Sequence, residues 1–183
     1  MERVGCADSS LFILWRMSGF EIATLPVEQL DELQPIWRSL YEHHLALTPY
    51  MRERARPPHE AWQARRQVER EWLAAEPSSF VLVATRDGAP IGYAFVRVRP
   101  GALFATSWRA SDPLAELSIL AVAPGERGVG VGTALLDAVE ARLADLGVAD
   151  MTIDVVAGNA GALRLYERRG AVPFVVELIQ RVG

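Results

Sequence analysis

The sequence has 183 residues, half of them hydrophobic and 23% charged, which suits one globular domain with a sizeable core. Its net charge of -4 disfavours a nucleic-acid binder, because such proteins usually carry a basic surface. The single cysteine excludes an intramolecular disulfide and a cysteine-rich zinc site. No apolar run is long enough to span a bilayer. We therefore expect no metal, no membrane and no nucleic-acid partner, and the scarcity of cysteine favours a cytoplasmic location.

The first residues differ from the rest of the chain. The apolar stretch Leu11–Trp15 is shorter than the apolar core of a signal peptide, and no small-residue cleavage site follows it. We therefore expect a weakly ordered N-terminal tail over residues 1–16 and a single domain over residues 17–183.

The first half of the domain is expected to form a strand, two helices and a hairpin. A short strand over residues 20–26 is closed by proline, and helices are predicted over residues 27–47 and 59–75. The apolar residues that define the first of these helices are Leu30, Leu33, Trp37, Leu40 and Tyr41. Two β-rich runs around Asp87-Gly88 predict a hairpin. The following loop, residues 99–115, is long enough to be either functional or mobile.

The second half alternates strands with helices. Strands are predicted over residues 116–124, 150–158 and 171–182, the last of them closing the chain. Between them, one helix begins at Val131, and a shorter one runs from Asn159, a natural N-cap, to Gly170. A hairpin followed by strand–helix–strand–helix–strand indicates a mixed α/β sheet covered by helices.

Three glycines alternate with other residues in Arg127-Gly-Val-Gly-Val-Gly132, directly at the start of a predicted helix. Glycine inside a helix costs about 1 kcal/mol relative to alanine, so helix stability does not explain them. A helix N-terminus leaves backbone N–H groups unpaired, and the helix dipole makes that end positive. A strand, a tight glycine turn and a helix therefore predict a site where amide hydrogens bind a phosphate.

Two common phosphate motifs do not fit this stretch. A Walker A loop requires Lys-Ser or Lys-Thr after its glycines, and neither is present. The dinucleotide fingerprint requires glycine where Thr133 stands, and no strand-end carboxylate lies about 20 residues further on. A plain tight turn explains one glycine readily and three alternating glycines less well.

The glycine stretch resembles the Arg/Gln-x-x-Gly-x-Gly/Ala motif of the GNAT superfamily of acyl-CoA-dependent N-acetyltransferases. The resemblance extends to the preceding strand, Glu-Leu-Ser-Ile-Leu-Ala-Val-Ala-Pro from Glu116, and to the helix from Asn159 to Gly170. It is specific over residues 116–170 and only topological over residues 20–98. Ala171 departs from the family, which usually has an aromatic residue after the helix-ending glycine.

The resemblance implies a GNAT-like α/β fold: a mixed, mostly antiparallel central sheet flanked by helices, with a splayed central strand pair that holds acyl-CoA. A bulge in the strand of residues 116–124 would separate it from the strand of residues 150–158. The pyrophosphate of acetyl-CoA would lie on the backbone amides of Arg127, Gly128, Val129, Gly130, Val131, Gly132 and Thr133. The pantetheine arm would pair with the backbone of Leu120, Ala121 and Val122, and Asn159 would help to hold it.

The single cysteine, Cys6, lies in the expected tail, so we expect no covalent acetyl-cysteine and instead a direct attack of a primary amine on the thioester in a ternary complex. The amine must be neutral, so a carboxylate within reach can remove its proton. Glu116 stands where family members often place a glutamate. A catalytic base and an ordinary surface glutamate at the start of a strand are equally favoured interpretations of this residue. Tyr166 matches the family tyrosine that protonates the departing thiolate, with packing beside Leu163 as the alternative. A backbone N–H near Leu120 would meet the oxyanion.

We expect the acceptor to be a small-molecule or peptide amine. The first two helices and the loop of residues 99–115 are the expected walls of its site, and Trp108 in that loop is naturally exposed. His43 and His44 are adjacent on a helix and point in different directions, so we do not expect them to chelate one metal. Homodimerisation stays open.

Three alternatives remain beside acetyl transfer. An enzyme could transfer a longer acyl group, and a non-catalytic sensor could bind acyl-CoA without turnover. A sensor would tolerate the loss of Glu116 and Tyr166, and both residues are present. A protein-interaction domain that used the fold alone would not need the glycine loop.

Overall fold

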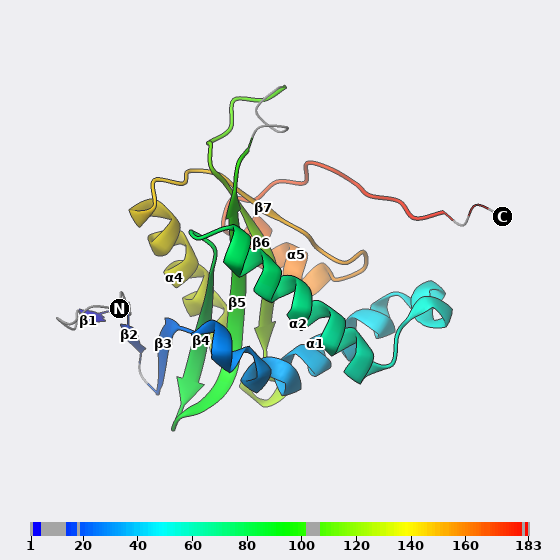
Figure 1. The fold of residues 1–183 in the computed structure, drawn as a ribbon, viewed down its shortest axis with the longest axis horizontal. Helices are drawn as coiled ribbons and strands as arrows, with labels where there is room; N and C mark the ends of the chain where they lie inside the picture. Colours follow the sequence, from blue (N-terminus) through cyan, green and yellow to red (C-terminus); the bar gives the residue numbers. More distant parts are fainter. Residues whose placement is uncertain (1, 5–13, 18, 102–106, 181, 183) are drawn as a thin grey trace.

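The computed structural model describes residues 2–4, 14–17, 19–101, 107–180 and 182. Seven strands and the flanking helices follow one another along the chain (Figure 1). The strands are β1 (Glu2–Val4), β2 (Leu14–Met17), β3 (Phe20–Thr24), β4 (Phe80–Arg86), β5 (Ala89–Arg99), β6 (Leu114–Val122) and β7 (Met151–Ile153). The α-helices are α1 (Gln34–Leu47), α2 (Pro58–Ala75), α4 (Val131–Asp145) and α5 (Ala160–Glu167). Short 3₁₀ helices are η1 (Val27–Leu33), η2 (Pro49–Arg54) and η3 (Pro124–Glu126).

The strands form one sheet in the order of the sequence, from β1 to β7. Every neighbouring pair is antiparallel except β6 and β7, which run parallel. Parallel neighbours need a crossover connection, and α4 supplies it. The mixed, mostly antiparallel α/β sheet expected from the sequence is thus confirmed.

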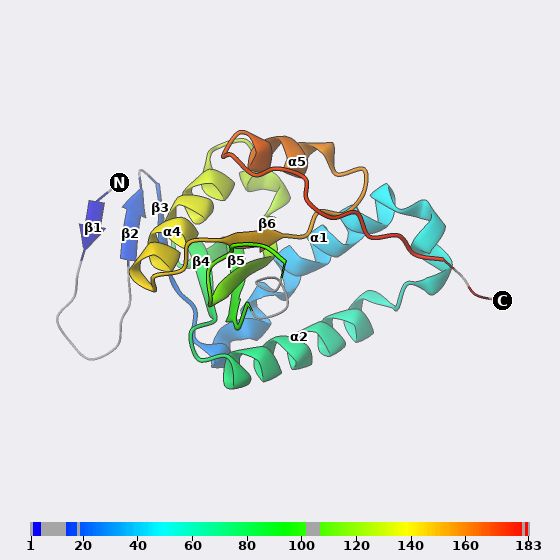
Figure 2. The same ribbon diagram turned by 90° about the horizontal axis from the view of Figure 1, so that it is seen from above.

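Helices cover both faces of the sheet, α4 and α5 on one and α1 and α2 on the other (Figure 2). Alternate residues of the central strands enter the two cores, because successive side chains of a strand point to opposite faces. Leu82 and Ala94 pack in the core beneath α4, whereas Val83 and Tyr93 pack in the core beneath α1 and α2. The sheet therefore separates two cores, one covered by α4 and α5 and the other by α1 and α2.

The structure differs from the sequence prediction at the C-terminal end. The closing strand predicted over residues 171–182 is wrong for the described residues 171–180 and 182, which belong to no strand. Apolar side chains there stay in contact with solvent, with Val172 79% and Leu178 87% exposed. Pro173 lacks an N–H for a sheet ladder, and β7 spans only Met151–Ile153, so a long partner strand is missing.

The N-terminal residues include two short strands at the edge of the sheet. β1 pairs with β2, and β2 pairs with β3, both in antiparallel register. Residues 5–13, with Cys6 among them, lie outside the described residues. The weakly ordered tail over residues 1–16 and the domain boundary at residue 17 stay predictions.

Gly92 on β5 lets α4 approach the sheet closely. A Cβ at this position would lie 3.0 Å from the Ala121 carbonyl oxygen, 3.0 Å from Val131 Cγ1 and 3.3 Å from Leu135 Cδ1. We expect Gly92→Ala to lower the free energy of unfolding by about 1–3 kcal/mol, because overpacking forces backbone shifts. Urea denaturation measures this change. Gly125→Ala, whose Cβ would meet nothing within 4 Å, is the control, and equal stability of both variants would contradict the expectation.

Candidate active site

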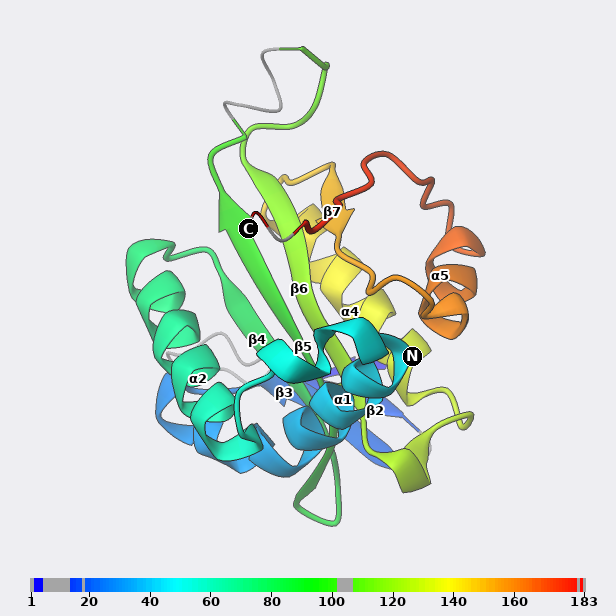
Figure 3. The same cartoon turned by 90° about the vertical axis from the view of Figure 1, so that its right-hand side faces the viewer.

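The strand β6 carries a bulge at Ser118. The register between β5 and β6 shifts at this residue, which has no partner on β5. β7 pairs with β6 only over Ala115–Leu117, so the two strands part at the bulge. Figure 3 shows the chain after β7 turning away from β6 toward α5. The splayed strand pair therefore leaves the backbone of β6 beyond Ser118 without a strand on that side within the described chain, and an extended ligand can pair with such an edge.

The glycine loop has the backbone that an anion site requires. Gly128 has φ 79° and Gly130 has φ 93°, a left-handed conformation that other residues adopt only with strain. Gly130 is the N-cap of α4 and offers no side chain to the first helical N–H groups. A Cβ at either glycine would meet nothing within 4 Å, so the space beside both positions is open. The first-turn amides of α4 can therefore face a phosphate.

Arg127 ties this loop to two neighbouring elements. Its Nε donates a hydrogen bond to the carbonyl oxygen of Val122 at 3.1 Å, at the end of β6. Its Nη2 lies 3.5 Å from Oγ of Ser39 on α1. The guanidinium group thus holds the glycine loop against the end of β6 and beside α1.

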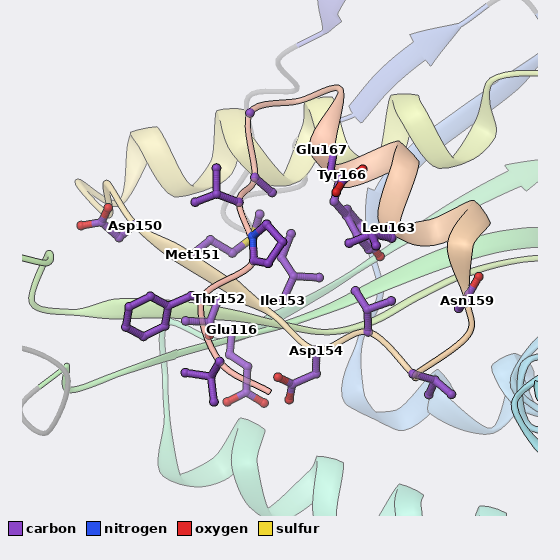
Figure 4. Close-up of a pocket in the computed structure, with 18 of the residues that line it drawn as sticks. Glu116, Asp150, Met151, Thr152, Ile153, Asp154, Asn159, Leu163, Tyr166 and Glu167 are labelled. Atoms are coloured by element: carbon purple, nitrogen blue, oxygen red, sulfur yellow. The ribbon is translucent and has the colours of Figure 1, made fainter. Parts of the chain in front are cut away.

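A pocket of about 860 Å³ lies between β6, β7, α5 and the segment that follows α5. Glu116, Asn159 and Tyr166, all predicted from the sequence, line it together (Figure 4). Residues 120–133, which include the predicted pyrophosphate and pantetheine contacts, are not among its lining residues. A ligand that touches both regions must therefore be long.

Glu116 is held by two arginines on the neighbouring strand. Its Oε2 lies 3.1 Å from Nη2 of Arg99 and 3.5 Å from Nη1 of Arg97. Arg97 also forms a bidentate ion pair with Glu76, so four alternating charges link the end of α2 to the pocket. The Glu116 side chain is only 14% exposed. The carboxylate is thus fixed in orientation at the pocket wall, where its charge is compensated.

Tyr166 is buried on α5 and faces the same pocket. Burial raises the pKa of its phenol to about 12. The hydroxyl group therefore stays protonated at neutral pH and can donate a proton or a hydrogen bond there. Leu163, one turn earlier, lines the pocket beside it (Figure 4).

Asn159 begins α5 as the sequence predicts. Its Oδ1 accepts a hydrogen bond from the backbone N–H of Ala162 at 3.2 Å, which caps the helix. The side-chain amide nitrogen is not used in this cap. It stays available to a ligand in the pocket that Asn159 lines.

Two residues of the site were missed by the sequence analysis. Asp154 is exposed, lines the pocket after β7, and forms no ion pair within the described chain (Figure 4). A polar residue directly after an apolar strand was the available signal. Arg65 on α2 donates hydrogen bonds to Oε1 of Glu69 and to Oγ of Ser118, both at 2.7 Å. It braces the bulge from 53 residues away in sequence, and no local pattern reveals that contact.

The tryptophans on the two helices and the loop that were expected to line the acceptor site differ in exposure. Trp37 and Trp62 are 7% and 3% exposed and belong to the core. Trp108 is 56% exposed and meets the ring of Phe174 edge-on, with centroids 5.3 Å apart. Phe174 lines the pocket, three residues after Ala171, where the sequence departs from the family pattern.

His43 and His44 lie with ring centroids 6.2 Å apart on α1. Burial, and next the neighbouring His43, lower the pKa of His44. Within the residues that the structure describes, no group of three or more histidine, cysteine, aspartate or glutamate side chains has the arrangement of a metal site. None of the described helices is long and apolar enough to cross a bilayer.

Residues 37–171 match the acetyltransferase (GNAT) family, a span that includes the bulged strand, the glycine loop and the pocket residues up to Ala171. The chain belongs to the GNAT family. A mycothiol acetyltransferase from Thermobispora bispora is 32% identical over 117 residues, which are 64% of this chain. Another from Propionibacterium freudenreichii subsp. shermanii is 25% identical over 143 residues, or 78% of this chain. The matches span 37% and 40% of these relatives, so this GNAT chain corresponds to little more than a third of their length.

Solved structures share the GNAT fold. A ribosomal-protein-alanine N-acetyltransferase from Brucella melitensis biovar Abortus 2308 superposes with a TM-score of 0.59 at 19% identity, covering 90% of this chain and 99% of its own. An aminoglycoside N-acetyltransferase in complex with CoA superposes with a TM-score of 0.63 at 21% identity, covering 89% and 94%. These similarities confirm the fold expected from the sequence.

Proposed function

We propose that this GNAT chain transfers an acetyl group from acetyl-CoA to a primary amine by direct attack in a ternary complex. The observation that carries the proposal is the splay of β6 from β7 at Ser118, with a glycine-capped helix at one end of β6 and a pocket at the other. The family includes mycothiol acetyltransferases, and a structural neighbour is an aminoglycoside acetyltransferase, which supports a small-molecule amine as acceptor.

The residues present fit acetyl-CoA at this site. The amides of residues 127–133 would bind the pyrophosphate, since the space beside Gly128 and Gly130 is open. The backbone of Leu120, Ala121 and Val122 would pair with the pantetheine arm, and the amide nitrogen of Asn159 would hold it. When bound, acetyl-CoA supplies an activated acetyl group as a thioester.

Side chains of the protein would accept and donate the protons of the reaction. Glu116 would take the proton of the attacking amine, directly or through water, as a general base. Tyr166 would donate to the departing sulfur, because its phenol stays protonated at neutral pH. A backbone N–H of the splayed strand near Leu120 would stabilise the oxyanion.

The test combines binding and turnover. Calorimetry with acetyl-CoA is expected to show one site per chain, and a panel of primary amines is expected to release free CoA, detected through its thiol. Binding without CoA release from any amine would favour the acyl-CoA sensor. An absence of binding would favour an interaction domain, and a preference for longer acyl donors would shift the reaction class without changing the site. The cytoplasmic location and a homodimer stay predictions.

Tyr166→Phe is expected to lower kcat about tenfold to a hundredfold while leaving the Kd for acetyl-CoA within about twofold. The effect is at the low end for general acids, because a thiolate with a reference pKa near 8.5 departs even without a proton. Stopped-flow release of CoA and calorimetry separate the two quantities. Leu163→Ala on the same helix face is the control for packing. A loss of stability with unchanged kcat in Tyr166→Phe would restrict the residue to a packing role.

A further inference from the structure

A second concave site lies between α1, η2 and α2. It encloses about 520 Å³, within the range of small-molecule sites. We call it the arginine recess, and it is lined among others by Trp37, Tyr41, Arg54, Arg56 and Arg65. None of these residues belongs to the pocket that contains Glu116 and Tyr166.

One wall of the arginine recess is aromatic. The rings of Trp37 and Tyr41 are stacked, with centroids 5.0 Å apart and an interplanar angle of 10°. Trp62 packs against Trp37 from the core side at 5.4 Å. Tyr41 Oη donates a hydrogen bond of 2.7 Å to the carbonyl oxygen of Arg56, which joins this wall to the segment after η2. The recess is thus preformed and can pack against a ring or a hydrocarbon body.

The charge of the arginine recess is positive. Arg54, Arg56 and Arg65 line it, and no aspartate or glutamate is among its lining residues in the described chain. The charge of Arg65 is offset by the buried Glu69, at 2.7 Å. Arg54 and Arg56 form no ion pair within the part of the chain that the structure describes. In a protein of net charge -4, this places two uncompensated guanidinium groups beside an aromatic wall.

Arg65 connects the arginine recess to the bulge of β6. Its Nη2 donates to Oγ of Ser118 at 2.7 Å, at the point where β6 and β7 part. A molecule in the recess therefore lies against the same side chain that braces β6 at Ser118, two residues before the backbone proposed to pair with the pantetheine arm. Guanidinium groups bind carboxylates through two parallel hydrogen bonds, so the recess matches an acidic group.

We propose that the arginine recess binds the far end of the acceptor, and that the acceptor is an amine with an aromatic or extended apolar body and a carboxylate. This inference rests on the proposed function. The carboxylate pairs with Arg54 and Arg56, the body packs on Tyr41, whose ring is stacked on the largely buried Trp37, and the amine extends past Arg65 toward β6.

A matched pair of amines tests the inference. 2-Phenylethylamine and 4-(2-aminoethyl)benzoate share the amine and the ring, and only the second carries a carboxylate. We expect kcat/KM for the carboxylate probe to exceed that for the other by roughly tenfold to a hundredfold, as one or two charge-assisted hydrogen bonds provide. Arg54→Ala and Arg56→Ala should each remove most of this preference. Arg52→Ala, an exposed arginine of the same segment outside the recess, should preserve it.

Binding of 4-ethylbenzoate, which has no amine, gives a readout besides turnover. Calorimetry should show binding that Arg54→Ala and Arg56→Ala weaken and that acetyl-CoA does not displace. Competition with acetyl-CoA would assign the recess to the cofactor and overturn the inference. So would equal kcat/KM for the two amines, or a preference that survives both substitutions. Failure of the proposed function is distinguishable, because it would leave benzoate binding intact while neither amine releases CoA.

Discussion

Gly130→Val is expected to weaken acetyl-CoA binding on the order of a hundredfold. The valine side chain would enter the open space beside the N-cap of α4, next to the amides where the pyrophosphate is proposed to lie. Each charge-assisted hydrogen bond that is lost costs about 1.5–3 kcal/mol, and about 1.4 kcal/mol corresponds to a tenfold change in Kd. Calorimetry of the folded variant measures the effect.

The same substitution also strains the backbone, because Gly130 has φ 93°. Gly147→Val is the matched control, since Gly147 has φ 71° at the other end of α4 and open space around its Cα. Both variants should lose about 1–2 kcal/mol of stability, the cost of a left-handed conformation for a residue with a Cβ. Only Gly130→Val should lose acetyl-CoA affinity. If both variants bind acetyl-CoA as tightly as the parent protein, the pyrophosphate lies elsewhere.

Glu116→Gln is expected to lower the rate about a hundredfold to ten-thousandfold near neutral pH, the usual range for a general base. Glutamine keeps the size of the side chain but accepts no proton. At high pH part of the amine is already neutral, so the deficit should shrink as pH approaches the pKa of the acceptor amine. The pH dependence of kcat/KM, followed by CoA release, measures this trend.

The ion pairs of Glu116 with Arg97 and Arg99 indicate a positioning role as an alternative to the general base. The same pH profile distinguishes the two roles. A deficit that is constant at every pH would mean that Glu116 positions the substrate or the arginines. Asp154→Asn is the matched control, because Asp154 is another carboxylate on the same pocket. A pH-dependent deficit in Asp154→Asn, together with a normal profile in Glu116→Gln, would transfer the role of the base to Asp154. Thermal unfolding of both variants checks that each protein is still folded after its carboxylate is replaced.

The parts of the fold predicted correctly are those encoded by neighbouring residues. The start of α4 follows from alternating glycines, and the start of α5 follows from Asn159, whose side chain caps the helix as expected. The hairpin follows from Asp87-Gly88 between two β-rich runs, and Asp87 indeed has a positive φ of 51°. Each of these signals lies within a few residues of the structure that it specifies.

The parts that failed depend on partners far away in the sequence. The apolar pattern of residues 171–182 is typical of a strand, but a strand needs a neighbour, and β7 is too short to serve as one. The family resemblance correctly implied a bulge in this strand but did not place it at Ser118, and the brace of the bulge by Arg65 appears only in three dimensions. The pairing of Glu116 with Arg97 and Arg99 depends in the same way on the register between β5 and β6. Such contacts require the folded sheet.

The segment after α5 belongs to no strand, and its local stability should differ from that of the sheet. Backbone amides of β5 and α4 lie in the core and should exchange hydrogen with solvent only on global unfolding, whereas those of residues 172–180, outside any strand, should exchange much faster. Residues 172–175 also form one wall of the pocket that contains Glu116 and Tyr166. Moving that wall should therefore require far less free energy than unfolding the sheet, so an acceptor can enter and a product can leave while the sheet and the splayed strands stay intact.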